Sequence, residues 1–153
     1  MSNFYLQLIP NDPTFVPPPQ AQEHATSLFK GFFPPSCRTK AEHCKQIEFF
    51  HPGQNWEGVN CPLCGASLKD QWWRTAMDEA YKTNWTVLET TVPCCGSRCS
   101  LNDLTYNFTA GFARFVLEAE NPGLAGVGRL DADQINKLQD ALGCSLRQIF
   151  CLF

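Results

Sequence analysis

Five cysteines gathered in two short runs constrain this chain more than any other feature of its sequence. The first run, CPLCG, occupies residues 61–65, and the second, CCGSRC, occupies residues 94–99. Each run surrounds a tight turn in which a glycine frees the backbone to fold under a metal ion. Structural Zn²⁺ takes four N or S ligands in a tetrahedron, and two such knuckles supply them. The pattern therefore predicts a zinc-knuckle region over residues 61–104.

Five thiols compete for the four places in such a site. Cys61 and Cys64 form the first pair. Because ligand pairs usually lie two to four residues apart, spacing favours Cys95 with Cys99, or Cys94 with Cys99, as the second pair. Neighbouring side chains diverge in an extended backbone, which makes adjacent cysteines a rarer choice. In the alternative interpretation, these cysteines are buried free thiols that pack as small hydrophobic side chains.

Length, charge and cysteine count narrow the class of protein. The chain has 153 residues, which suffices for a single domain, 1–153, and its twelve Phe and four Trp predict a bulky core. The formal net charge is −3 and the basic residues are scattered singly, which disfavours nucleic acid and anionic membranes as partners. The sequence has neither a transmembrane stretch nor a signal-peptide pattern. We therefore expect a cytoplasmic protein whose nine cysteines are free or metal-bound.

Hydrophobic periodicity predicts the strands and helices. Strand patterns occur at residues 4–9, 45–50, 86–92, 112–119 and 145–153, and the last of these is apolar on both faces, as in a central strand. Helical patterns occur at 20–33, from a Ser67 N-cap to about residue 82, and from a capping box of Asp131 and Gln134 to Gly143. The apolar stripe of the middle helix is expected to contain Trp73, Met77, Ala80 and Tyr81.

The order of these elements predicts the fold class. Strand–helix–strand occurs near the N-terminus and again over residues 112–153. Two such halves predict an α+β fold in which an antiparallel or mixed sheet carries helices on one face, as in ferredoxin-like folds. The zinc-ribbon-like site of four cysteines and the Trp-rich helix would lie between the halves. The alternative is a zinc ribbon with unrelated flanking elements.

Several motifs resemble those of a family of small uncharacterised bacterial proteins that carry CPxCG and PCCG motifs. They are CPLCG, a Trp-Trp helix that ends in AMDEAY, PCCG, SLNDL and GFARFVLE, and they cover roughly the last two-thirds of the chain. In those proteins the Cys-Cys pair is regular, whereas a cysteine at the position of Cys99 is not. The resemblance therefore implies Cys61, Cys64, Cys94 and Cys95 as the metal ligands. It implies no established activity.

The other thiols and the imidazoles allow an alternative site. A thiol nucleophile would pair Cys37 or Cys44 with one of the three histidines, His24, His43 or His51. His51 is also a candidate fourth metal ligand. Cys151 alternates with apolar neighbours and is expected in the core, and Asn102 and Asp103 are expected to bond backbone groups in a turn.

Four thiol ligands leave no open position for a substrate, so the pattern predicts a structural Zn²⁺. We expect a bacterial zinc-binding protein that acts through a protein partner, for example as an immunity protein that neutralises a toxin. Trp56, beside Glu57 in a polar loop, is the expected exposed anchor for that partner. The alternatives are a thiol- or metal-dependent enzyme that uses Cys44 or Cys99, and a nucleic-acid-binding zinc ribbon, which the acidic balance disfavours.

Overall fold

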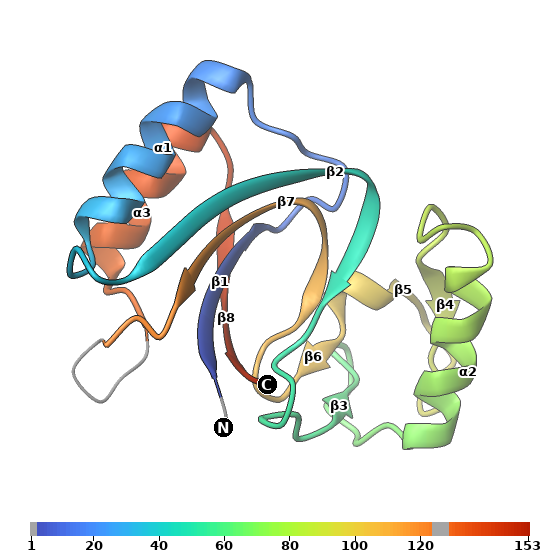
Figure 1. The fold of residues 1–153 in the computed structure, drawn as a ribbon. Coiled ribbons are helices and arrows are strands. Elements are labelled where there is room, and N and C mark those ends of the chain that lie inside the picture. The colour runs from blue at the N-terminus through green and yellow to red at the C-terminus, as the bar shows by residue number, and fades with distance from the viewer. Residues whose placement is uncertain (1–2, 124–128) are drawn as a thin grey trace.

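The computed structural model describes residues 3–123 and 129–153, and it has an α+β architecture (Figure 1). A four-stranded antiparallel sheet carries two helices on one face, and a segment of about 60 residues with its own helix is inserted between two of the strands. Within the described residues, no helix combines the length and the apolar character that a membrane span requires.

The sheet has the strand order β2-β7-β1-β8, and every neighbouring pair is antiparallel. Two strands of alternating apolar residues, β1 (Phe4–Pro10) and β7 (Gly111–Glu120), lie in its centre. The last strand, β8 (Leu146–Leu152), lies at an edge, so the expectation of a central last strand is wrong. Its apolar side chains enter two cores, and residues 52–54 pair with its C-terminal end at Leu152. There the Leu152 N–H donates to the Pro52 carbonyl at 3.0 Å.

The other edge strand, β2 (Arg38–Phe50), is much longer than the predicted strand at 45–50. Its first half alternates charged with small side chains, a pattern that fits an edge strand with one solvated face. Its register with β7 shifts between His43 and Glu48, where the strand bulges. The bulge bends β2 towards the insertion.

Both predicted outer helices are present, and they pack side by side on one face of the sheet (Figure 1). These are α1 (Pro19–Gly31) and α3 (Ala132–Leu142). The capping box of α3 is confirmed: Asp131 Oδ1 accepts from the Gln134 N–H at 2.8 Å, and Gln134 Oε1 accepts from the Asp131 N–H at 2.9 Å. The core under the helices consists of fully buried side chains from β1, α1, β7 and α3, namely Leu6, Leu8, Phe29, Phe115, Leu117 and Leu138.

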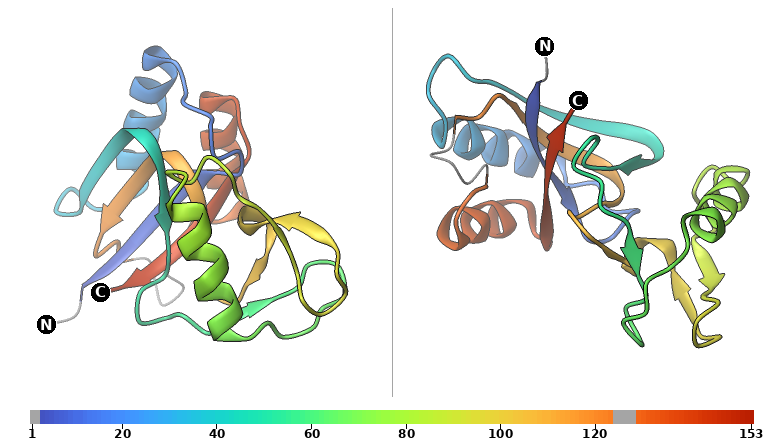
Figure 2. Two further views of the ribbon diagram at one scale, coloured as in Figure 1. Left: turned by 90° about the vertical axis from the view of Figure 1, so that its right-hand side faces the viewer. Right: turned by 90° about the horizontal axis from the view of Figure 1, so that it is seen from below.

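The insertion, residues 51–110, lies beside the sheet. It is seen at the right of Figure 1 and faces the viewer in the left view of Figure 2. It has a separate core in which aromatic rings surround Met77 and Ala80, and Phe112 of β7 closes that core from the sheet side. Its elements are β3 (Val59–Asn60), α2 (Asp70–Tyr81), β4 (Glu89–Thr91), β5 (Arg98–Ser100), the 3₁₀ turn η1 (Leu101–Asp103) and β6 (Thr105–Tyr106).

The predicted start and inner stripe of α2 need correction. Ser67 does not cap the helix, because it still pairs with Asn60 across a hairpin, and the helix begins three residues later at Asp70. Tyr81 is 67% exposed and not part of the buried stripe. It lies at the last residue of the helix, where its ring contacts Trp85 edge-on at 5.5 Å instead of entering the core.

A polar joint made by Asn102, Arg147 and the backbone at Ala110 connects the insertion to the sheet. The Asn102 side chain is only 3% exposed; its amide donates to the Asn11 carbonyl at 2.8 Å, and its Oδ1 accepts from the Phe112 N–H at 2.9 Å. Arg147 Nη1 donates to the carbonyls of Asn102 at 3.1 Å and Ala110 at 2.8 Å. Asn102 therefore does more than the expected local turn bonding, since it ties η1 to two strands of the sheet.

The joint makes a prediction about Gly111. A Cβ at this position would meet Arg147 Nη1 at 2.6 Å and Asn102 Oδ1 at 3.1 Å. Because hydrogen bonds hold both groups in place, Gly111→Ala should lower the free energy of unfolding by about 1–3 kcal/mol, measured by urea denaturation. Gly31→Ala is the matched control. Gly31 is the last residue of α1, and a Cβ added there would have no heavy atom within 4 Å. This substitution should raise stability by about 0.5 kcal/mol, and equal effects at both positions would contradict the close packing of the joint.

Candidate metal centre

Two hairpin turns of the insertion share one hydrogen-bond pattern. In the first knuckle, residues 61–66, the Cys61 N–H donates to the Ala66 carbonyl at 2.8 Å and the Gly65 N–H to the Cys61 carbonyl at 3.0 Å. In the second knuckle, residues 92–97, the corresponding donors are the N–H groups of Val92, at 2.9 Å to Ser97, and of Gly96, at 3.0 Å to Val92. Both turns end in a left-handed glycine, with φ of 76° at Gly65 and 70° at Gly96. A side chain there would strain the turn.

This shared pattern aligns CPLCGA with VPCCGS, residue by residue. Cys64 corresponds to Cys95, whereas Cys61 corresponds to Val92, which is fully buried. The second knuckle therefore lacks a thiol at its first position and has Cys94 at its third position instead, where the first knuckle has Leu63. The two knuckles are similar in backbone but supply their thiols from different positions.

The knuckles bring four sulfur atoms together. The sulfur atoms of Cys61, Cys64, Cys94 and Cys95 all lie within 4.8 Å of one another. Cys61 Sγ lies 4.0 Å from Cys95 Sγ, and Cys64 Sγ lies 3.3 Å from Cys94 Sγ. A tetrahedron with Zn–S bonds of about 2.3 Å has S···S edges of about 3.8 Å, so the observed spacings bracket those of a metal tetrahedron. All nine cysteines are free, and the four sulfurs can hold a metal ion.

The structure places Cys99 outside this cluster. Cys99 lies on β5 opposite Thr90 of β4, and its half-buried side chain packs against the apolar core of the insertion. Of the pairings considered for the second knuckle, the structure therefore brings together the adjacent cysteines, Cys94 and Cys95. They can approach the same point because they lie in a turn, where consecutive side chains do not alternate between two faces as they do in a strand.

Hydrogen-bond donors around two of the sulfurs favour the thiolate form. The backbone N–H of Cys64 and then that of Leu63, which lies 3.4 Å from the sulfur, lower the pKa of Cys61 to about 7. The hydroxyl and the backbone N–H of Ser97 lower the pKa of Cys95. The pKa of Cys94 is raised to about 12, because its sulfur loses solvent inside the cluster and contacts other thiols. Metal binding must therefore release protons, and acidification below about pH 7 opposes it by protonating Cys61.

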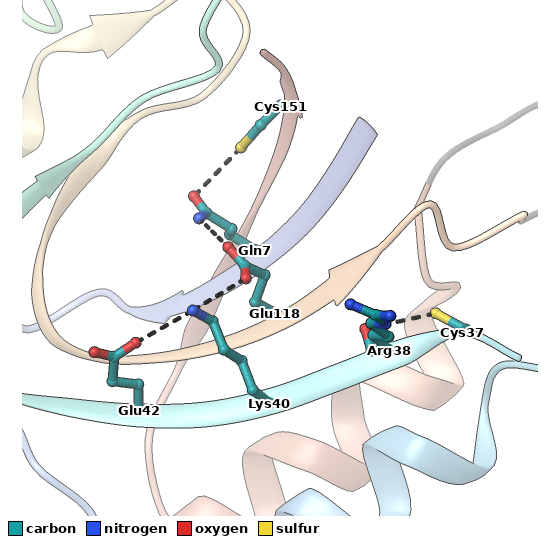
Figure 3. Close-up of polar contacts among 7 residues, drawn as sticks. All are labelled: Gln7, Cys37, Arg38, Lys40, Glu42, Glu118 and Cys151. Atoms are coloured by element: carbon teal, nitrogen blue, oxygen red, sulfur yellow. Dashed lines mark hydrogen bonds and ion pairs between the residues drawn. The ribbon is translucent and has the colours of Figure 1, made fainter. Parts of the chain in front are cut away.

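The thiols outside the cluster are in environments that keep them protonated. Burial raises the pKa of Cys37, that of Cys44 to about 11 and that of Cys151 to about 12. Cys151 is fully buried, as expected, and begins a polar chain across the sheet (Figure 3). Its Sγ donates to Gln7 Oε1 at 3.3 Å, Gln7 Nε2 donates to Glu118 Oε1 at 2.8 Å, and Lys40 forms an ion pair with Glu118 at 3.4 Å.

The alternative site, a thiol–imidazole pair, is not joined by a hydrogen bond in the described part of the chain. Among the described residues, no hydrogen bond joins a histidine to Cys37 or Cys44; the Cys37 thiol donates instead to the Glu120 carbonyl at 3.3 Å. His51 is not part of the group of possible metal ligands. Its Nδ1 accepts from the Gly53 N–H at 3.1 Å, and its ring packs on Phe49 and Phe153.

Trp56 is not the exposed anchor that its polar sequence context predicted. It is half-buried, with its ring 4.7 Å from that of Trp73 and 5.7 Å from that of Tyr106. The loop folds back because Gly53 pairs with Leu152 at the end of β8, which directs the following residues into the insertion core. One sequence signal could have indicated this: all four Trp residues lie in the insertion, where a small core needs large side chains.

Comparison of the chain with protein-family models, with curated proteins and with solved structures finds no match. The chemistry of the sulfur cluster therefore carries the assignment of the site.

The cluster predicts which cysteines a metal requires. Cys61→Ser, Cys64→Ser, Cys94→Ser and Cys95→Ser should each weaken Co²⁺ binding by roughly 100-fold or more, because each removes a thiolate from the cluster. Cys99→Ser is the matched control and should leave the sulfur-to-cobalt absorption band unchanged. Loss of that band in Cys99→Ser together with its retention in Cys94→Ser would assign the fourth ligand to Cys99 instead.

Proposed function

We propose that Cys61, Cys64, Cys94 and Cys95 hold a structural Zn²⁺ and that the protein acts by binding a protein partner. The observation that carries the zinc assignment is the set of four converging sulfurs with hydrogen-bond donors already aimed at two of them. A site closed by four thiolates suits Zn²⁺ and leaves no position for a substrate, so the metal would stabilise the insertion and would not catalyse a reaction.

We also propose the finer fold assignment, a ferredoxin-like sheet with a zinc-ribbon-like insertion. Its support is topological. The two strands of the unit β1-α1-β2 are separated in the sheet by β7, and the two strands of the unit β7-α3-β8 are separated by β1. Such interleaved β–α–β units define the ferredoxin-like arrangement. The insertion then replaces the short connection between the two units.

The partner-binding proposal is supported by an exposed apolar residue at the metal site. Leu63 is 60% exposed although it lies between two of the four cysteines, Cys61 and Cys64. A bound metal would fix the turn on both sides of it, and a side chain on a rigid backbone loses little entropy when it binds. We assign the tip of the first knuckle, at Leu63, as the contact for a partner in place of Trp56. An immunity-type function in a bacterial cytoplasm would require such a contact.

The competing functions have less support. An enzyme that uses Cys37, Cys44 or Cys99 needs a thiolate, and burial raises the pKa of each of these thiols. A nucleic-acid-binding zinc ribbon needs clustered positive charge, whereas the chain has a formal net charge of −3. Membership of the bacterial CPxCG family stays a proposal that rests on the shared motifs.

The metal proposal is tested through tryptophan fluorescence. All four Trp residues lie in the insertion, so their emission reports on that part of the molecule alone. The purified protein should contain one zinc ion per chain with four sulfur neighbours by X-ray absorption. Because structural zinc supplies about 10 kcal/mol in small zinc modules, its removal by a chelator, or by acid strong enough to protonate the bound thiolates, should shift the emission to longer wavelength. A reduced, metal-free protein with unchanged emission and stability would refute the proposal.

The partner contact is tested with two exposed apolar residues of the insertion. Leu63→Asp should keep its zinc but lose its partner, because the charge disrupts the apolar tip. Val87→Asp is the matched control, since Val87 is 55% exposed but lies outside both knuckles, beside Ala80 near the end of α2. A partner captured from the native cell and then purified should form a complex with the control and not with Leu63→Asp. Equal binding of the partner by both variants would show that Leu63 does not contact it.

A further inference from the structure

Arg147 carries a charge that forms no close ion pair within the described part of the protein. Its side chain is half-buried, and this burial lowers its pKa. Its hydrogen bonds all go to neutral acceptors: Nε donates to Asn11 Oδ1 at 3.1 Å, and Nη1 donates to the carbonyls of Asn102 and Ala110. A guanidinium held only by neutral acceptors keeps its capacity to bind an anionic group directly.

The third nitrogen of the same guanidinium is available. In the described structure Nη2 has no hydrogen-bond partner, and Arg147 lines a cavity of about 300 Å³ between the sheet and the insertion. Two threonine hydroxyls, those of Thr105 and Thr109, line the cavity too, and neither forms a hydrogen bond with another described residue. The cavity therefore has one cation and two hydroxyl donors that lack partners among the described residues.

The backbone holds this cavity in a fixed and partly strained form. Phe108, which precedes Thr109, has φ of 65°, a value that a bulky side chain rarely adopts. On the other side, Nη1 of Arg147 fills the space next to Gly111 that a Cβ would otherwise take. The guanidinium is thus positioned by three acceptors and by the absence of a neighbouring side chain. Preorganisation of this kind is expected of a binding site and is more than a solvated arginine needs.

We propose that this cavity binds the carboxylate group of a ligand, with one oxygen accepting from Arg147 Nη2 and the other from the Thr109 hydroxyl. A carboxylate supplies the directly bonded anion that the guanidinium lacks, and charge-assisted hydrogen bonds to arginine are among the stronger ones in proteins. This inference is independent of the zinc and partner proposals, because it uses none of the cysteines and not Leu63.

The charge of the site favours a carboxylate over a phosphate. Asp103 also lines the cavity, and it is the acidic side chain whose charge acts on Arg147. Asp103 balances the charge of Arg147, so the site as a whole has no net charge. A singly charged carboxylate can still accept directly from Nη2, whereas a phosphate dianion would be repelled more strongly by Asp103. The ligand is therefore either a free small carboxylate or the carboxylate at the end of a peptide chain, and the volume suits both.

The test is a titration of the zinc-loaded protein followed by ¹H–¹⁵N NMR. The probes are acetate and N-acetylglycine, with N-acetylglycinamide as the control that lacks the charge and inorganic phosphate as the competing anion. Both carboxylates should shift the Arg147 Nε–H and Thr109 N–H signals saturably, and the other two probes should not. Tighter binding of N-acetylglycine by about tenfold or more would identify a peptide end as the ligand, and equal binding would identify a free small carboxylate.

Two variants that leave the hydrogen bonds of the joint intact provide the second arm. Thr109→Val removes a proposed donor and should weaken N-acetylglycine binding by roughly fivefold. Asp103→Asn removes the repulsion at the rim and should tighten it by roughly threefold, which a purely structural arginine would not produce. The proposal is overturned if no carboxylate gives a saturable shift, if N-acetylglycinamide gives the same shift, or if both variants bind like the wild type.

Discussion

The convergence of four sulfur atoms is the constraint on which the insertion depends. Its β-ladders are very short: β3 pairs with β6 over two residues and β4 pairs with β5 over three. Ladders of this length are not stable by themselves in water. The two ladders share the aromatic core, and their knuckles meet at the four sulfurs. Four thiolates within 4.8 Å of one another repel unless a cation lies between them, so a metal ion would turn this contact from a repulsive one into a stabilising one.

Aromatic packing transmits that order to the sheet. Phe49 and Phe112 belong to strands of the sheet, yet their rings lie 4.9 Å apart inside the insertion core, and Trp85 packs on Phe112 at 5.1 Å. Tyr106 fits into this core because its polar group is satisfied: its hydroxyl donates to the Leu101 carbonyl at 2.6 Å and accepts from Trp73 Nε1 at 3.4 Å. The insertion is consequently a second core fused to the first through shared aromatic residues.

Local patterns in the sequence predicted the features that local physics decides. The capping box at Asp131, the strands β1 and β7 and the convergence of two cysteine turns all follow from residues close together in the chain. The failures have tertiary causes. Trp56 looked exposed because its neighbours are polar, but Gly53 pairs with β8 and turns it inward. The edge position of β8 was missed because its apolar side chains enter two different cores, which a sequence pattern cannot distinguish from the two faces of a central strand.

The choice between Cys94 and Cys99 as a ligand depends partly on local sequence and partly on the folded backbone. Ligand spacing, the usual guide, favoured Cys99, whereas alignment of the two knuckles on their glycines, Gly65 and Gly96, matches Cys95 with Cys64 and excludes β5 from the turn. That alignment uses only the sequence, but its relevance depends on both turns having the same hydrogen bonds, which the spacing of cysteines does not reveal. The backbone of a knuckle is thus a better guide to its ligands than the interval between its thiols.

One continuous segment of the chain connects the metal centre to the Arg147 cavity through the polar joint. The second knuckle ends at residue 97, β5 follows, and η1 then supplies Asn102, whose N–H is held by Ser100 Oγ at 3.2 Å. Asn102 in turn fixes Arg147 through its carbonyl, while Arg147 itself belongs to the sheet. One wall of the cavity therefore comes from the segment that the sulfur cluster holds in place, and its charge comes from the other core. A cavity of this origin exists only when the insertion is docked, so ligand binding there would stabilise the docked insertion by mass action, just as a metal in the cluster would.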